Sequence, residues 1–145
     1  MQTIKETGWV QRIALLNQEI TNLLNQQLKF PAINANNYFY LLKLLDNPGI
    51  TQSDFNALIK VNQSTITRAI NSLVEKGYIE KLPAKDKRSQ LLQLTPLGTE
   101  TAQGIKLEVD ALNQHLFEKD AAQFDQLLTK TSTALKDYSK NKTDH

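Results

Sequence analysis

The stretch that decides the fold runs from residue 62 to residue 98 and reads NQSTITRAINSLVEKGYIEKLPAKDKRSQLLQLTPLG. Its first half has the apolar spacing of a helix that ends near Lys76, and 78–82 and 90–94 read as two short strands. Upstream, Thr51 begins a capping pattern for a shorter helix that reaches Ile59. A short helix, a turn, a second helix and a hairpin, in this order, predict a winged helix-turn-helix.

The second helix of this motif has two different faces. Ile66, Ile70 and Leu73 share one side, which we expect to be buried. The opposite side carries small hydroxyls, amides and one guanidinium, from Ser64, Thr67, Arg68 and Asn71. A helix of this size is about 22 Å long and fits a DNA major groove about 12 Å wide. Polar exposed faces are also common on helices that bind nothing, so the hairpin that follows is what favours DNA.

The hairpin lies in the most basic part of the chain. Residues 60–90 hold seven basic and three acidic side chains, whereas residues 1–59 are balanced and residues 91–145 have two more acids than bases. A basic loop alone is usually a solvated turn. Directly after a candidate recognition helix, it is typical of a wing that contacts phosphates and a minor groove.

The flanking segments predict long amphipathic helices. Apolar stripes indicate helices over 9–28 and 36–46, another that begins at Pro96, and a last one over 120–138, with a polar, frayed tail at 139–145. The expected fold is therefore mainly α with a small two- to three-stranded β wing. We assign residues 35–96 to a winged helix-turn-helix DNA-binding lobe. Residues 1–34 and 97–145 form the flanking helical region, whose apolar stripes suit burial either in the core of the same chain or against a partner.

Composition argues against an enzyme or a metalloprotein. The 145 residues include no cysteine, which excludes a thiolate nucleophile, a cysteine-based zinc site and a thiol redox switch. Of the two histidines, His115 stands five positions after Asp110. Two metal ligands on one face of a helix need a spacing of three or four residues. No glycine loop suits a phosphate cofactor. We predict no catalytic residues, no metal and no cofactor.

No segment has the length and apolar character of a membrane span, and the first eight residues lack the apolar core of a signal peptide. We therefore expect a cytoplasmic protein with no membrane partner.

From about Asn36 to Gly98 the sequence resembles the MarR family of bacterial transcription regulators. The matching fragments are STITR at 64–68, LVEKGYI at 73–79, DKR at 86–88 and LTPLG at 94–98. Each fragment alone is weak evidence for the family, but the order and spacing of all four are specific to it. The terminal helices resemble the family only in pattern.

This resemblance implies which residues contact DNA. The helix positions that match the groove-facing positions of the family are Gln63, Ser64, Thr65, Thr67 and Arg68. Arg88 matches a wing arginine that probes the minor groove, and Asp86 matches the wing acid that orients it. Lys85 and Lys87 are expected to contact phosphates. Thr51 and Gln52, at a helix N-terminus, are further candidates for phosphate contact, although Thr51 equally suits a cap alone.

The resemblance also implies a homodimer that pairs through its terminal helices, which makes residues 1–34 and 97–145 a helical dimerisation region, although amphipathic helices more often bury their apolar faces in their own core. The dimer is expected to bind a pseudo-palindromic double-stranded operator with half-sites about 10 bp apart, and to act as a repressor. Family members often respond to a small aromatic or phenolic effector. Trp9, Phe30, Tyr38, Phe39 and Tyr40 are candidates to line such a pocket, and ordinary core packing explains the same residues. The alternative function is a winged-helix module that binds protein and no specific DNA.

Two positions depart from the general helix-turn-helix pattern. Asn56 stands where a small residue often lets the two helices approach, and Lys60 stands where the turn commonly has glycine. Either change would alter the crossing angle or be accommodated locally.

Overall fold

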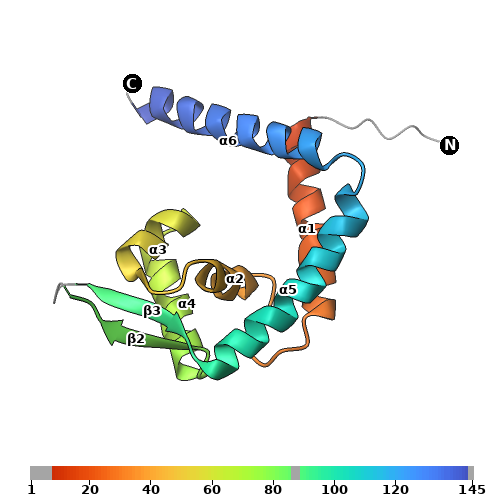
Figure 1. Ribbon diagram of the computed structural model, residues 1–145. Coiled ribbons are helices and arrows are strands. Elements are labelled where there is room, and N and C mark those ends of the chain that lie inside the picture. The colour runs from red at the N-terminus through yellow and green to blue at the C-terminus, as the bar shows by residue number, and fades with distance from the viewer. Residues whose placement is uncertain (1–7, 86–88, 144–145) are drawn as a thin grey trace. The chain divides into compact units, whose positions relative to one another are not determined.

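The structure, a computed structural model, describes residues 8–85 and 89–143 and separates into two compact units, residues 1–108 and 109–145. The elements in chain order are α1 (Trp9–Gln27), α2 (Tyr38–Asp46), β1 (Ile50–Thr51), α3 (Gln52–Ile59), α4 (Gln63–Glu75), β2 (Ile79–Pro83), β3 (Gln90–Leu94), α5 (Pro96–Phe117) and α6 (Ala121–Thr143). The predicted class, mainly helical with a small sheet, is confirmed (Figure 1).

The sheet has three antiparallel strands in the order β1-β3-β2. β2 and β3 form the predicted hairpin, with Ile79 opposite Leu94 and Pro83 opposite Gln90 (Figure 1). β1 adds a short third strand, in which Ile50 pairs with Leu92. Thr51 thus ends a strand and caps the following helix, so the start of α3 is fixed to the hairpin.

The ends of α4 follow from local hydrogen bonds. Asn62 is the N-cap, and its Oδ1 accepts from the backbone N–H of Ser64 at 2.9 Å. At the other end Gly77 has a φ of 85°, its N–H donates to the Val74 carbonyl, and the Tyr78 N–H donates to the Leu73 carbonyl. This Schellman arrangement ends α4 and turns the chain directly into β2.

The core of the lobe lies between the helices and the sheet. Phe55 of α3, Ile66 and Ile70 of α4 and Leu92 of β3 are fully buried. α4 packs against β2, α2 packs against β3, and α3 contacts α4 and β3. The predicted apolar face of α4 is therefore confirmed, and burying it turns the polar face of the helix outward.

The start of α5 packs closely against the turn that follows α4. The Thr95 hydroxyl donates to the Gly77 carbonyl at 2.5 Å and accepts from the Gly98 N–H at 2.9 Å, so Thr95 caps the N-terminus of α5. Gly98 lies so close to Tyr78 that a Cβ on it would be 1.9 Å from the Tyr78 carbonyl oxygen. The Tyr78 hydroxyl in turn donates to the Pro31 carbonyl at 2.5 Å. Tyr78 thus joins three segments that are distant in sequence.

The turn between α3 and α4 accommodates both unusual residues. Lys60 is the C-cap of α3 and adopts the left-handed conformation, with a φ of 60°, which explains why glycine is favoured at such a turn. Asn56 is half-buried, and its Oδ1 has no hydrogen-bond partner among the described residues. The lysine and the asparagine are therefore tolerated at a local cost in stability.

The first helix is buried only toward its C-terminal end. Leu24 and Leu28 are in the core of the first unit, whereas Trp9 is 78% exposed and Ile13 is 56% exposed. The predicted apolar stripe of this helix therefore does not lie wholly in the core of its own unit.

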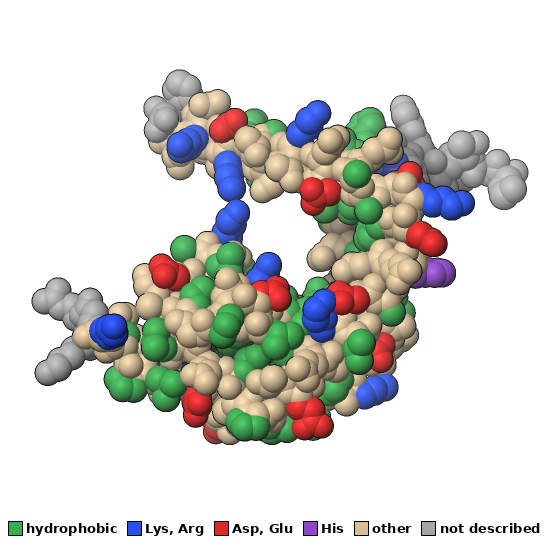
Figure 2. Space-filling view, viewed as in Figure 1, with side chains coloured by type: hydrophobic (Ala, Val, Ile, Leu, Met, Phe, Trp, Pro, Cys, Tyr) green, Lys and Arg blue, Asp and Glu red, His purple; other side chains and the backbone are tan. Residues whose placement is uncertain are grey.

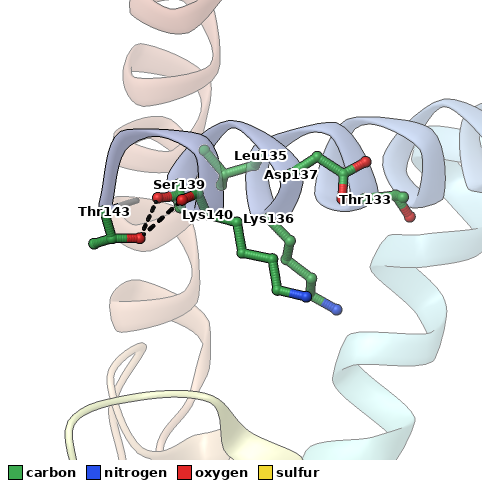
Figure 3. A pocket seen from close by; sticks show the side chains of 7 residues that line it. All are labelled: Thr133, Leu135, Lys136, Asp137, Ser139, Lys140 and Thr143. Atoms are coloured by element: carbon green, nitrogen blue, oxygen red, sulfur yellow. Dashed lines mark hydrogen bonds between the residues drawn. The ribbon is translucent and has the colours of Figure 1, made fainter. Parts of the chain in front are cut away.

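In the second unit, the prediction of a frayed tail is wrong for residues 139–143, and residues 144–145 lie outside the described residues. We expected a helix over 120–138, but α6 continues to Thr143. The Thr143 hydroxyl donates to the carbonyls of Ser139 at 2.9 Å and Lys140 at 3.0 Å (Figure 3). These bonds and the basic side chains of the last turn stabilise the C-terminal end of the helix.

Candidate nucleic-acid interface

The polar side chains predicted to face DNA are brought together on α4. Gln63, Ser64, Thr67 and Arg68 line one shallow hollow on its surface. Among the α4 residues predicted to contact DNA, Thr67 is half-buried. The others are exposed: Gln63, Ser64, Thr65, Arg68 and Asn71. The surface therefore offers one guanidinium, amides and hydroxyls, groups that can bond to base edges and to phosphate oxygens.

Ser64 is held in place before any ligand arrives. Its hydroxyl donates to Asn62 Oδ1 at 2.6 Å, and the same oxygen caps the helix. With its hydrogen used in this way, Ser64 presents an oxygen to the exterior, which is suited to accept a hydrogen bond.

Thr51 and Gln52 occupy the N-terminal end of α3, as predicted. The Thr51 side chain accepts from the Asp54 N–H at 3.1 Å, so it is a helix cap. This observation supports the structural role of Thr51, and a phosphate contact by either residue stays a prediction.

The predicted wing is the β2–β3 hairpin. Its strands are joined beyond Pro83 by a loop in which the Ala84 N–H donates to the Ser89 carbonyl at 3.4 Å, and Lys85 is exposed. The other predicted wing residues, Asp86, Lys87 and Arg88, lie outside the described residues, and their roles stay predictions.

One contact between the helix and the wing was missed by sequence reasoning. Lys81 of β2 donates from Nζ to Asn71 Oδ1 of α4 at 2.7 Å. The sequence shows Lys81 only as one basic residue among several. The pairing depends on how α4 packs against β2, which no local pattern reveals.

The candidate effector residues are distributed over several elements. Phe39 packs against the rings of Tyr38 and Tyr40, with centroids at 5.6 and 4.8 Å. Phe30 lies beside Gly104, where a Cβ would be 2.9 Å from Phe30 Cζ. Burial raises the pKa values of the Tyr38 and Tyr40 hydroxyls above their ordinary value of 10.0. Trp9 is instead largely exposed.

Two further predictions concern metals and membranes. Among residues 8–85 and 89–143, no three acidic or histidine side chains come together in a way that could hold a metal ion. No helix in the described part of the chain has the length and apolar character to cross a membrane.

Comparisons with known proteins converge on one family. The sequence model of the MarR family matches residues 33–89. The multiple antibiotic resistance protein MarR of Salmonella typhimurium is 30% identical over 123 residues, covering 84% of this chain and 78% of that protein. The Bacillus subtilis HTH-type transcriptional regulator YybA is 30% identical over 79 residues, and the chain spans about half of its length, 53%.

Among solved structures, a mutant of E. coli MarR complexed with operator DNA superimposes with a TM-score of 0.74. It is 29% identical, and the match covers 84% of this chain and 91% of that one. The similarity therefore extends well beyond the winged lobe.

Proposed function

The chain belongs to the MarR family of transcription regulators, and from this premise we propose that it binds a pseudo-palindromic DNA operator as a homodimer and represses transcription. The observation that carries the proposal is the two-sided α4. Ile66, Ile70 and Leu73 are buried on one side, and the polar residues of the shallow hollow lie on the other. A related E. coli protein has been crystallised with operator DNA, which supports the same partner for this chain.

The residues proposed to contact DNA are those predicted above on α4, at the start of α3 and on the wing. In this proposal α4 enters the major groove, and its hydroxyl, amide and guanidinium groups contact base edges and the nearest phosphates. The wing adds basic side chains toward the neighbouring backbone and minor groove, with Arg88 as the minor-groove probe.

The proposed homodimer is supported by apolar surface on the terminal helices. On α1, the Trp9 and Ile13 side chains are mostly exposed. In the second unit Leu127 is 61% exposed and Leu135 is 64% exposed, and Figure 2 shows hydrophobic side chains on the surface of α6. Apolar surface of this kind is typical of a protein–protein interface. Repression follows if the dimer covers a promoter and excludes polymerase.

The proposed regulation by a small aromatic or phenolic ligand involves Trp9, Phe30, Tyr38 and Phe39. The ring contacts of Tyr38 and Phe39 support core packing for these two residues. This regulation is a separate part of the proposal, because we propose operator binding for the chain without an effector. The direct measurement is operator release during titration with benzoate and with phenol, and release by neither compound would remove this part of the proposal.

The experiment that tests the main proposal is selection of bound duplexes from a random pool, followed by binding of the selected duplex at two salt concentrations. We expect an inverted repeat with half-sites about 10 bp apart and an affinity that falls steeply with salt as phosphate contacts release counterions. No enrichment, with only weak binding that disappears at modest salt, would instead favour the protein-interaction module. Repression is then measured with a reporter placed behind the selected operator.

A further inference from the structure

The contact between Lys81 and Asn71 determines what this part of the surface can offer to a ligand. Lysine is only a donor, so the atom that accepts at 2.7 Å from Nζ must be the amide oxygen of Asn71. This identifies which end of the amide faces β2. The amide nitrogen, Nδ2, is then the end that remains for an external partner.

Asn71 lies on the same stripe of α4 as the other predicted DNA contacts. It follows Thr67 by four positions and Arg68 by three, so it lies one helical turn further along this face. Asn71 is exposed, and Lys81 is half-buried on the strand against which α4 packs. The pair therefore stands where the recognition helix meets the wing.

The hydrogen bond restricts how Asn71 can read DNA. An asparagine that recognises adenine uses both ends of its amide, accepting at oxygen and donating from nitrogen. Here the oxygen is directed to Lys81, and turning it to a base would break the 2.7 Å bond. Among the described residues, this bond leaves two N–H donors on Asn71 and two on Lys81 for an external partner. A donor-only, positively charged pair matches a phosphate group, which has only acceptors.

We propose that Lys81 and Asn71 form a phosphate clamp, in which Lys81 positions the Asn71 amide and both side chains bind the DNA backbone without reading sequence. This inference rests on the proposed operator binding and deepens it. It separates α4 into a sequence-reading part around Thr67 and Arg68 and a backbone-anchoring part at Asn71.

The test uses the full chain and the duplex selected by the wild-type protein. Asn71→Ala should weaken binding roughly tenfold and leave the motif selected from a random pool unchanged. Lys81→Met should weaken binding by a similar factor and reduce the slope of log affinity against log salt by about 0.9 for each lysine contact removed. Because the two residues act together, the double variant should lose less affinity than the product of the two single losses.

Two further variants separate the clamp from general effects of charge and folding. Lys43→Met removes the same charge from an exposed position of α2 and should change affinity and salt slope much less. Asn71→Asp keeps an acceptor for Lys81 but replaces the outward donors with a negative charge. It should therefore bind DNA more weakly than Asn71→Ala while unfolding at the same urea concentration as the wild type.

The outcomes distinguish this inference from the proposed function. If the wild-type chain enriches no duplex, operator binding fails and the clamp fails with it. If the wild type binds and Asn71→Ala loses preference at one base pair in each half-site, Asn71 reads a base and only the clamp is overturned. Unchanged affinity in both single variants overturns the clamp alone as well.

Discussion

At the scale of single residues, Gly98 shows how a missing side chain holds two elements together. The start of α5 approaches the Tyr78 backbone so closely that a Cβ on Gly98 would meet its carbonyl oxygen at 1.9 Å and its carbonyl carbon at 2.9 Å. Both atoms belong to the backbone, so they cannot move aside without displacing the strand. The close contact at Gly104 is different, because it is made by the ring of Phe30, a side chain.

These two glycines give a matched pair of substitutions. Gly98→Ala should lower the free energy of unfolding by about 3 kcal/mol, because backbone must shift to admit the methyl group. Gly104→Ala should change it by less than about 1 kcal/mol, since the gain in helix propensity offsets a small movement of Phe30. Urea unfolding of both variants measures the difference. Equal losses would contradict the close backbone approach at Gly98.

Tyr78 supplies a second prediction at this scale. Its hydroxyl donates to the Pro31 carbonyl, and burial raises its pKa above the ordinary value of 10.0. Tyr78→Phe should therefore cost about 1 kcal/mol at neutral pH through the lost hydrogen bond. The exposed Tyr138→Phe is the control, and it should cost little.

The pH dependence of this effect has a definite sign. As pH rises above about 10, tyrosines deprotonate in the unfolded chain while buried Tyr78 stays protonated, so stability falls with pH. The stability that depends on protonated Tyr78 is complete below pH 10 and is lost as pH rises through the folded pKa. The alkaline decline should be shallower in Tyr78→Phe than in the wild type. A decline of the same steepness, measured by urea unfolding between pH 8 and 11, would refute this role.

At the scale of elements, α4 is the helix that we propose reads the DNA sequence. Arg68 lies opposite the buried Ile66 and Ile70, and half-buried Thr67 lies beside them. Both line the hollow that we propose faces the major groove. Replacing both Thr67 and Arg68 with alanine should change the motif selected from a random pool and weaken binding to the original operator by about 1–3 kcal/mol. Arg12→Ala, which removes a guanidinium from α1, should leave the motif intact. An unchanged motif in the α4 double variant would end the assignment.

The wing supplies a separate prediction, based on sequence because residues 86–88 lie outside the described part of the chain. Arg88→Ala should reduce operator affinity by about 1–3 kcal/mol if its guanidinium enters the minor groove. Lys87→Ala is the matched comparison, because a phosphate contact from the same loop should lose less. Equal losses in a binding titration would remove the special role of Arg88.

At the scale of the whole molecule, the decisive property is the oligomeric state. α6 has no buried residue among its described positions, and its Leu127 and Leu135 side chains are mostly exposed. Apolar side chains that stay in water contribute no hydrophobic stabilisation to a single chain, whereas burial against a second copy would. We therefore predict a particle of twice the 16.4 kDa chain mass.

Replacing both Leu127 and Leu135 with aspartate should convert this dimer to a monomer, because each carboxylate would be buried without a partner. The same variant should lose affinity for the two-half-site operator. Thr133→Asp is the control, since Thr133 is separated by about 120° around the helix from Leu127 and by about 160° from Leu135, and this variant should remain dimeric. Light scattering after size-exclusion chromatography measures all three masses, and a monomeric wild type would refute the dimer.

Much of the fold was predictable because its signals are local. The cap at Asn62, the turn at Gly77, the proline that begins α5 and the spacing of Ile66, Ile70 and Leu73 each act within a few residues. Local signals also predicted that the polar side chains of α4 are exposed, because burial of one face of a helix leaves the other face toward solvent. The end of α6 was mispredicted because a polar tail gives no apolar periodicity, although hydroxyl bonds continue the helix.

The sequence by itself thus determined the order of elements, the inner and outer faces of α4 and the absence of cysteine chemistry. Only the tertiary structure decided that β1 joins the sheet, that Tyr78 connects three distant segments and that Lys81 holds the Asn71 amide. The physical reason is the distance along the chain over which each interaction acts. Helix periodicity and caps depend on neighbours in the chain, whereas these three contacts require separate elements to be packed before their atoms can meet.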